Sequence, residues 1–289
     1  MRIAIASGKG GTGKTTIATS LALSLLGRGE IWYLDCDVEA PNGHLFLKPE
    51  LNQQAEAVIR VPQIDASRCS LCGKCVDVCQ FHALAKVGKT IMVFPQLCHG
   101  CGSCTWNCPE EAILEIPNPI GVLESGMTVE GIRFSRGLLN ISEPMPTPVI
   151  RQLKNLHAFS KDAIVILDAP PGASCSVVET LRRSDYILLV TEPTPFGLHD
   201  LKQMFGIVKE MGIPAAVIIN RDNGVYQPLT DFCVDADFPI LMRIPYERHI
   251  AEGLASGRTL IEIFPEYKKT FAQIFEKIGS SLASVAYGK

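Results

Sequence analysis

The chain has 289 residues, 47% of them hydrophobic, and a formal net charge of −3. A chain of this length and composition buries a sizeable core in one or two domains. Its lysines and arginines form no run that would neutralise a row of phosphates, which argues against nucleic acid as a partner.

The first residues, MRIAIASGKGG, hold one arginine, a short apolar run and then glycines, so they predict a buried strand and not a signal peptide. No stretch approaches the roughly 20 apolar residues that a membrane-spanning helix needs. We therefore expect a cytoplasmic protein without stable membrane association. Disulfides are rare in that compartment, so the eight of the chain's 11 cysteines that lie in C-x2-C runs are expected to bind metal.

Short apolar runs alternate with segments of helical periodicity at both ends of the chain. This order predicts an α/β fold with a mostly parallel, doubly wound sheet covered by helices on both faces. The predicted strands are 2–6, 31–34, 163–167, 186–190, 215–219 and 240–244. The predicted helices are 14–26, 176–183, 198–211, 247–256 and 266–284.

A phosphate-binding loop follows the first predicted strand. Gly8, Gly13, Lys14 and Thr15 satisfy G-x4-G-K-T between a strand and a helix, which is the context this motif requires. Lys14 supplies a charge to the phosphates and the Thr15 hydroxyl can bind Mg²⁺. The alternative is a glycine-rich turn without a ligand. The residues expected to contact the nucleotide phosphates are Gly8, Gly10, Gly11, Thr12, Gly13, Lys14, Thr15 and Thr16.

The loop also carries a second lysine, Lys9, within KGGTGKT. In this form it resembles the deviant Walker A loop of the MinD/ParA superfamily of dimeric P-loop ATPases. The resemblance implies that Lys9 reaches across a dimer interface to the nucleotide of the partner. The alternative is a solvated loop lysine.

Three further segments resemble the same superfamily: LDCDVEAPN (34–42) its first switch, LDAPPG (167–172) its Walker B and second switch, and TEPTPFGLHDL (191–201) the segment that follows. The resemblance implies that Asp37 orients the attacking water, that Asp35 supports the Mg²⁺ shell and that Asp168 holds Mg²⁺ through water. An Asp that only caps a turn is the alternative, chiefly for Asp35.

By their position in the family, Asn220, Arg221 and Pro245 are expected to approach the adenine. Asn220 ends a predicted strand, where asparagine is often only a turn former.

The cysteine runs CSLCGKCVDVC and CHGCGSCTWNC begin at Cys69 and, 29 positions later, at Cys98. All four cysteines of each run align, which indicates an internal duplication. The spacing is too dense for one tetrahedral zinc and is that of bacterial ferredoxins, in which the fourth cysteine of each run binds the other cluster. Zinc or another metal is the alternative. The expected [4Fe–4S] ligand sets are Cys69, Cys72, Cys75 and Cys108 for one cluster, and Cys98, Cys101, Cys104 and Cys79 for the other.

Weaker predictions concern the turn after Cys79, two neighbouring histidines and the three cysteines outside the runs. Cys79 lacks the proline that follows Cys108, so we expect a shifted turn there and no lost cluster. His82 and His99 are expected at the surface or behind the ligands. The leftover cysteines, Cys36, Cys175 and Cys233, are expected to pack as small apolar residues. The iron protein of nitrogenase, a relative of the superfamily, has a cluster ligand at a place similar to Cys175.

We therefore expect a P-loop domain made of residues 1–59 and 119–289, with a ferredoxin-like α+β domain inserted at 60–118. Residues 119–148 are rich in glycine and proline and predict irregular hairpins.

The whole chain is similar to MinD-superfamily ATPases that contain an inserted ferredoxin domain. The resemblance implies Mg²⁺-dependent ATP hydrolysis in a homodimer, or in a heterodimer with a related ATPase. It also implies coupling of that hydrolysis to electron transfer, or to assembly of a metal cofactor on a partner protein. ATP and Mg²⁺ are expected to favour a closed dimer that hydrolysis releases.

Two alternatives come from other classes of protein. A spatial-positioning switch of the MinD kind should end in a basic amphipathic membrane helix, whereas the tail GSSLASVAYGK has one lysine and few bulky apolar residues. A redox-sensing or scaffold module would have structural clusters and an idle ATPase.

Overall fold

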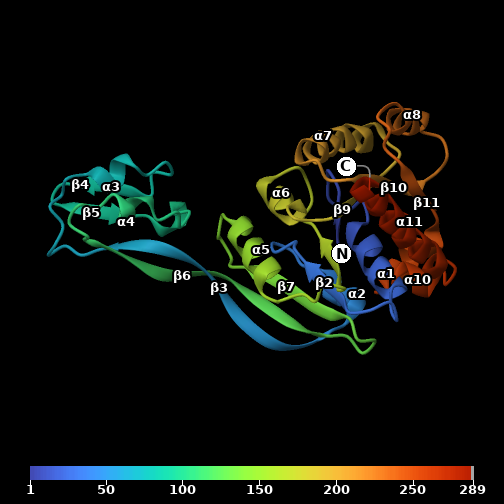
Figure 1. The fold of residues 1–289 in the computed structure, drawn as a ribbon, viewed down its shortest axis with the longest axis horizontal. Coiled ribbons are helices and arrows are strands. Elements are labelled where there is room, and N and C mark those ends of the chain that lie inside the picture. Colours follow the sequence, from blue (N-terminus) through green and yellow to red (C-terminus); the bar gives the residue numbers. More distant parts are fainter. Residues whose placement is uncertain (288–289) are drawn as a thin grey trace.

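A computed structural model describes residues 1–287, which form a large body and a small lobe carried away from it on a long ribbon of strands (Figure 1). Within the described residues, nine strands form the sheet of the body in the order β11-β10-β9-β1-β8-β2-β7-β6-β3. Neighbours from β11 to β7 are parallel, whereas β6 is antiparallel to both β7 and β3. The strands are β1 (Arg2–Ala6), β2 (Ile31–Asp35), β3 (Glu50–Ile64), β6 (Ile113–Met127), β7 (Arg133–Leu139), β8 (Ile164–Asp168), β9 (Tyr186–Thr191), β10 (Ala215–Asp222) and β11 (Ile240–Pro245).

Helices cover both faces of this sheet (Figure 1). One layer contains α5 (Pro146–Asn155), α6 (Cys175–Leu181), α7 (Pro195–Met211) and α8 (Gln227–Asp235). The other contains α1 (Lys14–Ser24), α2 (Gly43–Leu47), α9 (Arg248–Ala255), α10 (Leu260–Ile263) and α11 (Tyr267–Tyr287). The predicted α/β fold with a mostly parallel, doubly wound sheet is confirmed, as are its predicted strands and helices.

Side chains alternate between the two faces of the sheet along each central strand, and this alternation explains the two helical layers. In β1, Ala4 and Ala6 face the core under α5 to α8, whereas Ile3 and Ile5 face the core under α1 and α11. Both sides of such a strand are apolar because both are covered, which is why it reads as a continuous apolar run. Among the described residues, every helix is too short or too polar to traverse a bilayer. Gly288 and Lys289, the last two residues of the tail GSSLASVAYGK, lie outside the described residues.

The expectation of irregular hairpins at 119–148 was wrong. These residues contain the second half of β6, all of β7 and most of α5. The prolines and glycines that suggested loops lie in paired strands and in the first turn of α5, where proline is tolerated.

β3 and β6 form the ribbon that joins the body to the lobe. They pair from Glu50 with Met127 to Ile64 with Ile113, and they run without interruption through residues 60 and 118. The ribbon is thus shared by body and lobe, and the compact part beyond it, residues 65–112, is called the cysteine lobe below. Its elements are α3 (Lys74–Asp77), β4 (Leu84–Val87), β5 (Thr90–Val93), the short 3-10 helix η1 (Pro95–Leu97) and α4 (Ser103–Trp106).

Helix α5 clamps the ribbon where its ladder is irregular. Val58 of β3 lies opposite Pro119, which has no N–H to donate, and the register shifts between Ala57 and Val58. The Gln152 side chain replaces the missing partners: its Oε1 accepts from the Val58 N–H at 3.1 Å and its Nε2 donates to the Val58 carbonyl at 2.9 Å.

The same helix is tied to the end of α6. The buried Lys154 ammonium donates to the carbonyls of Glu179, Thr180 and Arg182 at 2.6, 2.8 and 2.6 Å. Carbonyls at the end of a helix have no partner inside it, so Lys154 completes the last turn of α6. Burial lowers the pKa of Lys154 to about 8. Gln152 and Lys154 therefore connect the ribbon to α6 through one short helix.

The substitution Lys154→Met should destabilise the body, because it leaves three buried carbonyls without a donor. We expect a loss of about 3 kcal/mol in the free energy of unfolding, measured by denaturant titration. Lys161→Met, at an exposed lysine, is the control and should change stability little. Equal stability of the two variants would show that the Lys154 contacts do not stabilise the C-terminal end of α6.

Candidate functional site

The loop between β1 and α1 has the shape that phosphate binding requires. Gly13 has φ of +95°, and a Cβ there would lie 2.4 Å from Asn220 Nδ2, so this position admits only glycine. Asn220 Nδ2 in turn donates to the carbonyl of Thr12 at 2.8 Å and fixes the loop against β10. The first N–H groups of α1 have no partner inside the helix and form an anion site at its start.

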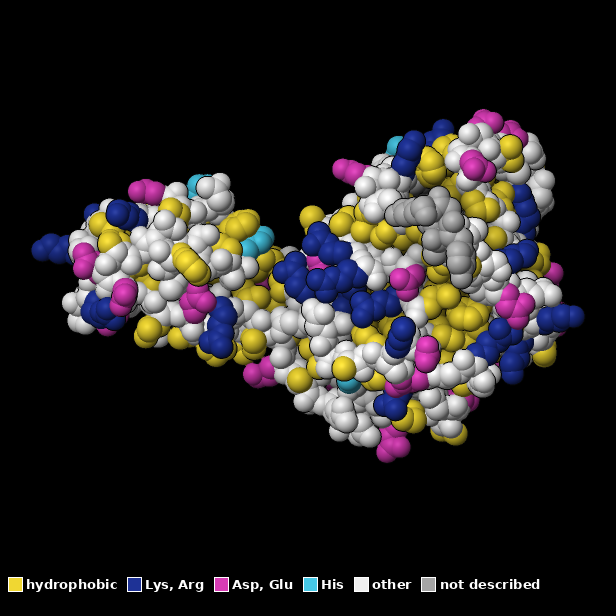
Figure 2. All heavy atoms as spheres, viewed as in Figure 1, with side chains coloured by type: hydrophobic (Ala, Val, Ile, Leu, Met, Phe, Trp, Pro, Cys, Tyr) yellow, Lys and Arg dark blue, Asp and Glu magenta, His cyan; other side chains and the backbone are white. Residues whose placement is uncertain are grey.

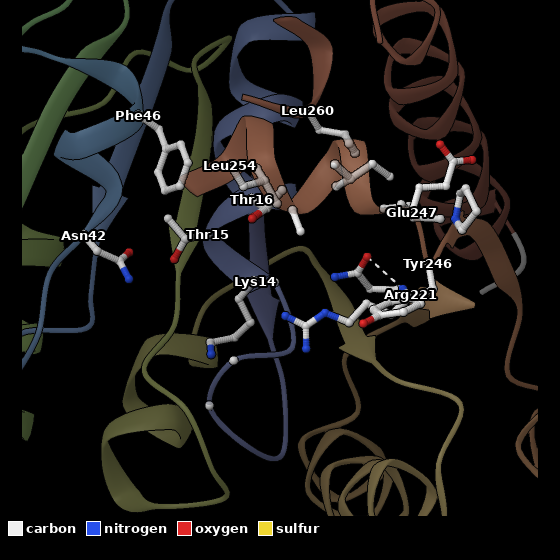
Figure 3. Close-up of a pocket in the computed structure, with 18 of the residues that line it drawn as sticks. Lys14, Thr15, Thr16, Asn42, Phe46, Arg221, Tyr246, Glu247, Leu254 and Leu260 are labelled. Atoms are coloured by element: carbon white, nitrogen blue, oxygen red, sulfur yellow. Dashed lines mark hydrogen bonds between the residues drawn. The ribbon is translucent and has the colours of Figure 1, made fainter. Parts of the chain in front are cut away.

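A cavity of about 310 Å³ opens in front of this loop (Figure 3). Asn42 and Phe46 lie on one side of it, Tyr246 and Glu247 lie on the other, and Lys14 lies between them. Most of the residues predicted to bind nucleotide line it: Gly10, Gly11, Gly13, Lys14, Thr15, Thr16, Asp37, Asn220, Arg221 and Pro245. Gly8 and Thr12 also belong to the loop, but they line a separate small cavity beside Asp200 and Leu201.

Asp168 lies at the end of β8, deep in the site. Its Oδ2 accepts from the Thr15 hydroxyl at 2.7 Å and from the Tyr33 hydroxyl at 2.8 Å. Its Oδ1 is buried and has no hydrogen-bond partner among the described residues. Burial raises the pKa of Asp168, and the hydrogen bond from Thr15 and the charge of Lys14 oppose this. A carboxylate beside a threonine hydroxyl fits a Mg²⁺ ion held by Thr15 directly and by Asp168 through water.

Asp35 lies beside Asp168, in register on the neighbouring strand. Its Oδ2 accepts from the N–H groups of Asn42 and Gly43 at 3.0 and 2.8 Å, and its Oδ1 from the N–H of Asp37 at 3.3 Å. These bonds hold the turn after β2 in place. This contact pattern is the one that the turn-capping alternative for Asp35 describes.

Asp37 lines the cavity, unlike Asp35. Burial, and next the charge of Asp168, raise the pKa of Asp37 to about 6, while Lys14 opposes the rise. Burial lowers the pKa of Lys14, while the charges of Asp168, Asp37 and Asp35 raise it. The site thus gathers three carboxylates around one buried lysine.

Lys9 is held away from this cavity. Its Nζ pairs with Glu192 Oε2 at 3.1 Å, and Arg221 pairs with the other oxygen of the same carboxylate. Glu192 therefore connects the phosphate loop to the end of β10. The sequence prediction missed Glu192, although it lies within the segment 191–201 that resembles the family. Tyr33 was also missed, because in sequence it is one more apolar position of a buried strand.

The cysteines of the two runs line two small cavities. Each set surrounds a small cavity of the cysteine lobe and combines three cysteines of one run with the fourth of the other. The set next to Ile64 and Ile113 contains Cys69, Cys72, Cys75 and Cys108. The set next to Arg60 and Glu115, closer to the body, contains Cys79, Cys98, Cys101 and Cys104. Within the described residues, no three His, Cys, Asp or Glu side chains converge around a single metal ion.

Backbone N–H groups contact three of these sulfurs. The N–H groups of Ala83 and Ala112 donate to Cys79 and Cys108 Sγ, both at 3.3 Å, and the Gly100 N–H donates to Cys98 Sγ at 3.4 Å. Hydrogen bonds to sulfur are a usual feature of iron–sulfur sites. Burial raises the pKa of Cys75, Cys98 and Cys104, which favours the neutral thiol at these three positions.

The duplication also extends to the backbone. α3 and α4 occupy matched positions, 29 residues apart, as do the Ala83 and Ala112 contacts. The left-handed residues of the two runs also match: Leu71 with Gly100, Gly73 with Gly102, and His82 with Glu111. The expected shift of the turn after Cys79 is therefore wrong, because this turn depends on a left-handed residue at its third position and not on proline.

The predictions for the two histidines and for the three cysteines outside the runs have mixed outcomes. His82 is exposed, as expected, and His99 is exposed and stacks on Phe81 with ring centroids 3.6 Å apart. Cys36 and Cys233 are buried, as expected. The expected packing of Cys175 is wrong, since this residue is exposed at the start of α6.

Comparison with known proteins identifies relatives across the full chain. A protein of Methanocaldococcus jannaschii, MJ0579, is 30% identical and the match covers 91% of this chain and 92% of that protein. The chicken protein named cytosolic Fe-S cluster assembly factor NUBP2 is 25% identical, with coverage of 91% and 85%.

Solved structures show the same fold. The septum site-determining protein MinD of Pyrococcus horikoshii, complexed with Mg-ADP, superposes with a TM-score of 0.56 and 20% identity over 99% of this chain and 96% of that one. The family model described as CobQ/CobB/MinD/ParA nucleotide binding domain matches residues 3–261. This match spans most of the chain, and the chain therefore belongs to the CobQ/CobB/MinD/ParA family of nucleotide-binding proteins.

Proposed function

We propose that this protein is a Mg²⁺-dependent ATPase in which nucleotide-dependent closure of a dimer controls an iron–sulfur lobe, for electron transfer or for assembly of a metal cofactor on a partner. The observation that carries the proposal is a set of hydrogen bonds from α5. They join the ribbon of the cysteine lobe to α6, the helix that follows Asp168.

Each residue of the nucleotide site has a role in this reaction. Lys14 and the N–H groups at the start of α1 bind the phosphates, and Asp37 orients the attacking water. Thr15 and Asp168 hold Mg²⁺, which neutralises the charge that develops on the phosphate oxygens. Asn220, Arg221 and Pro245 contact the base. Lys9 leaves Glu192 to reach the nucleotide of the partner, so hydrolysis needs the dimer.

The cysteine lobe is a ferredoxin-like domain in this proposal. Cys69, Cys72, Cys75 and Cys108 hold one [4Fe–4S] cluster, and the set of Cys79, Cys98, Cys101 and Cys104 holds the other. Such clusters supply one-electron chemistry when bound. The chain contributes the cross-run grouping of thiols, the N–H donors to sulfur and the apolar walls formed by residues such as Ile64, Ile91 and Ile113.

The path between the two sites is short and made of ordered contacts. β8 ends at Asp168, the segment 169–174 leads into α6, Lys154 binds the end of α6, and Gln152 binds Val58 in the ribbon. A change around the triphosphate that moves α6 also moves α5, because Lys154 is bound to three carbonyls at the end of α6. The ribbon follows α5 through Gln152, which changes the position of the lobe.

The partners follow from the same chemistry. The dimer is a homodimer or a pairing with a related ATPase, and the client is a redox protein or a protein that receives a metal cofactor. The name of the NUBP2 relatives, cytosolic iron–sulfur cluster assembly factors, supports the second type of client and a cytoplasmic location.

Iron content tests the grouping of the cysteines. Protein purified without oxygen should hold about eight irons per chain with equimolar sulfide, and Cys79→Ser should lose about half. Because Cys79 and Cys98 belong to one set, C79S/C98S should lose no more than either single variant, whereas C69S/C79S should lose nearly all. Cys233→Ser is the control. The reverse pattern in the double variants would show that each run forms its own cluster.

Coupling predicts that the ATPase rate depends on the redox state of the clusters. We expect the oxidised and reduced proteins to differ by roughly fivefold, the size of a modest allosteric coupling. Gln152→Ala should shrink this difference while the oxidised protein keeps its rate, because the clamp on the ribbon is lost. Gln203→Ala, at an exposed residue of α7, is the control. Equal rates for oxidised and reduced wild type would contradict coupling and favour structural clusters.

A further inference from the structure

Tyr33 places a hydroxyl group against Asp168 from a position that looks like core. It belongs to β2, whose five residues are all buried, and its own relative exposure is 0%. Its hydroxyl donates to Asp168 Oδ2 at 2.8 Å. A buried hydroxyl requires a partner, and here the partner is the carboxylate expected to hold the Mg²⁺ shell.

The ring of Tyr33 is locked in place. It stacks on Phe134 with ring centroids 5.5 Å apart and an interplanar angle of 9°. On another side it touches Gly43, where an added Cβ would lie 2.6 Å from Tyr33 Cε1 and 2.7 Å from its hydroxyl oxygen. The hydroxyl therefore has one direction available, and that direction is toward Asp168. Gly43 also donates its N–H to Asp35 at 2.8 Å. The ring of Tyr33 therefore contacts Gly43, which binds Asp35, while its hydroxyl binds Asp168.

The hydrogen bonds of Asp168 are divided unequally between its two oxygens. Oδ2 accepts from both Tyr33 and Thr15, whereas Oδ1 is buried and has no partner among the described residues. Two donors on one oxygen fix the rotation of the carboxylate. Without Tyr33 the Thr15 hydroxyl would be the single donor to Oδ2, and one hydrogen bond leaves the carboxylate freer to rotate.

We propose that Tyr33 is a positioning residue of the ATPase, whose hydroxyl fixes the orientation of the Asp168 carboxylate, the group that the proposed function assigns to the Mg²⁺ shell. This inference rests on the proposed function. Tyr33 does not touch the nucleotide; it acts through Asp168 and through its packing against Gly43. A leucine or valine, which suits a buried parallel strand equally well, would leave Asp168 with Thr15 as its only hydroxyl donor.

The substitution Tyr33→Phe tests the inference, because it keeps the ring and its packing and removes only the hydroxyl. Binding is measured by calorimetric titration of Mg²⁺ into protein saturated with ADP, so that no hydrolysis is involved. The Mg²⁺ concentration at half-saturation should rise about tenfold, the usual effect of losing a hydrogen bond to a charged group. ADP affinity in the presence of EDTA should stay unchanged.

Tyr186→Phe is the matched control, since Tyr186 is buried in β9 and burial alone raises its pKa. Thermal unfolding of the nucleotide-free variants separates packing from positioning. If Tyr33→Phe unfolds at a lower temperature but takes up Mg²⁺ like the wild type, the inference is overturned and Tyr33 is only a core residue. If the wild type itself binds no Mg²⁺ with ADP, the proposed function fails instead.

Discussion

Two buried carboxylates in adjacent positions determine how the site is built. Asp35 and Asp168 are paired across β2 and β8, and their relative exposures are 0% and 1%. Like charges in such a place destabilise the fold unless donors surround them. Asp35 obtains its donors from the turn after β2, which therefore folds back onto the strand end. Asp168 obtains its own from Thr15 and Tyr33. The phosphate loop and the first switch are both anchored by this pair.

The cysteine lobe is a second example of structure dictated by local chemistry. Each half contains a short helix between cysteines, and the matched residues with positive φ turn the chain so that N–H groups face sulfur. Such backbone bends expose amides toward an anionic centre without any charged side chain. The fourth cysteine of each run lines the cavity that the first three cysteines of the other run also line.

The parts of the fold that sequence predicted share one property: they are buried on both faces, and continuous apolar runs such as RIAIA record that burial. The ribbon escaped prediction for the opposite reason. β3 reads ELNQQAEAVIRVPQI and is largely exposed, while β6 contains Pro117 and Pro119. Its stability comes from pairing between strands 49 or more residues apart, which no local pattern reveals. The P-loop was predictable because its fixed spacing reflects the turn between β1 and α1, whereas Tyr33 and Glu192 make contacts that only the folded chain creates.

The stiffness of the ribbon makes its attachment points important. A flexible linker would absorb any movement of the body, but a paired two-stranded ribbon rotates as a unit about the place where it is held. Gln152 holds it at Val58, and the strand continues from there to Ile64, a length of roughly 20 Å. A small rotation at Val58 is therefore enlarged at the lobe. On the other side, β6 pairs with β7, and β7 pairs with β2, the strand that ends at Asp35. The ribbon is thus attached to both carboxylates, through β7 to Asp35 and through α5 and α6 to Asp168.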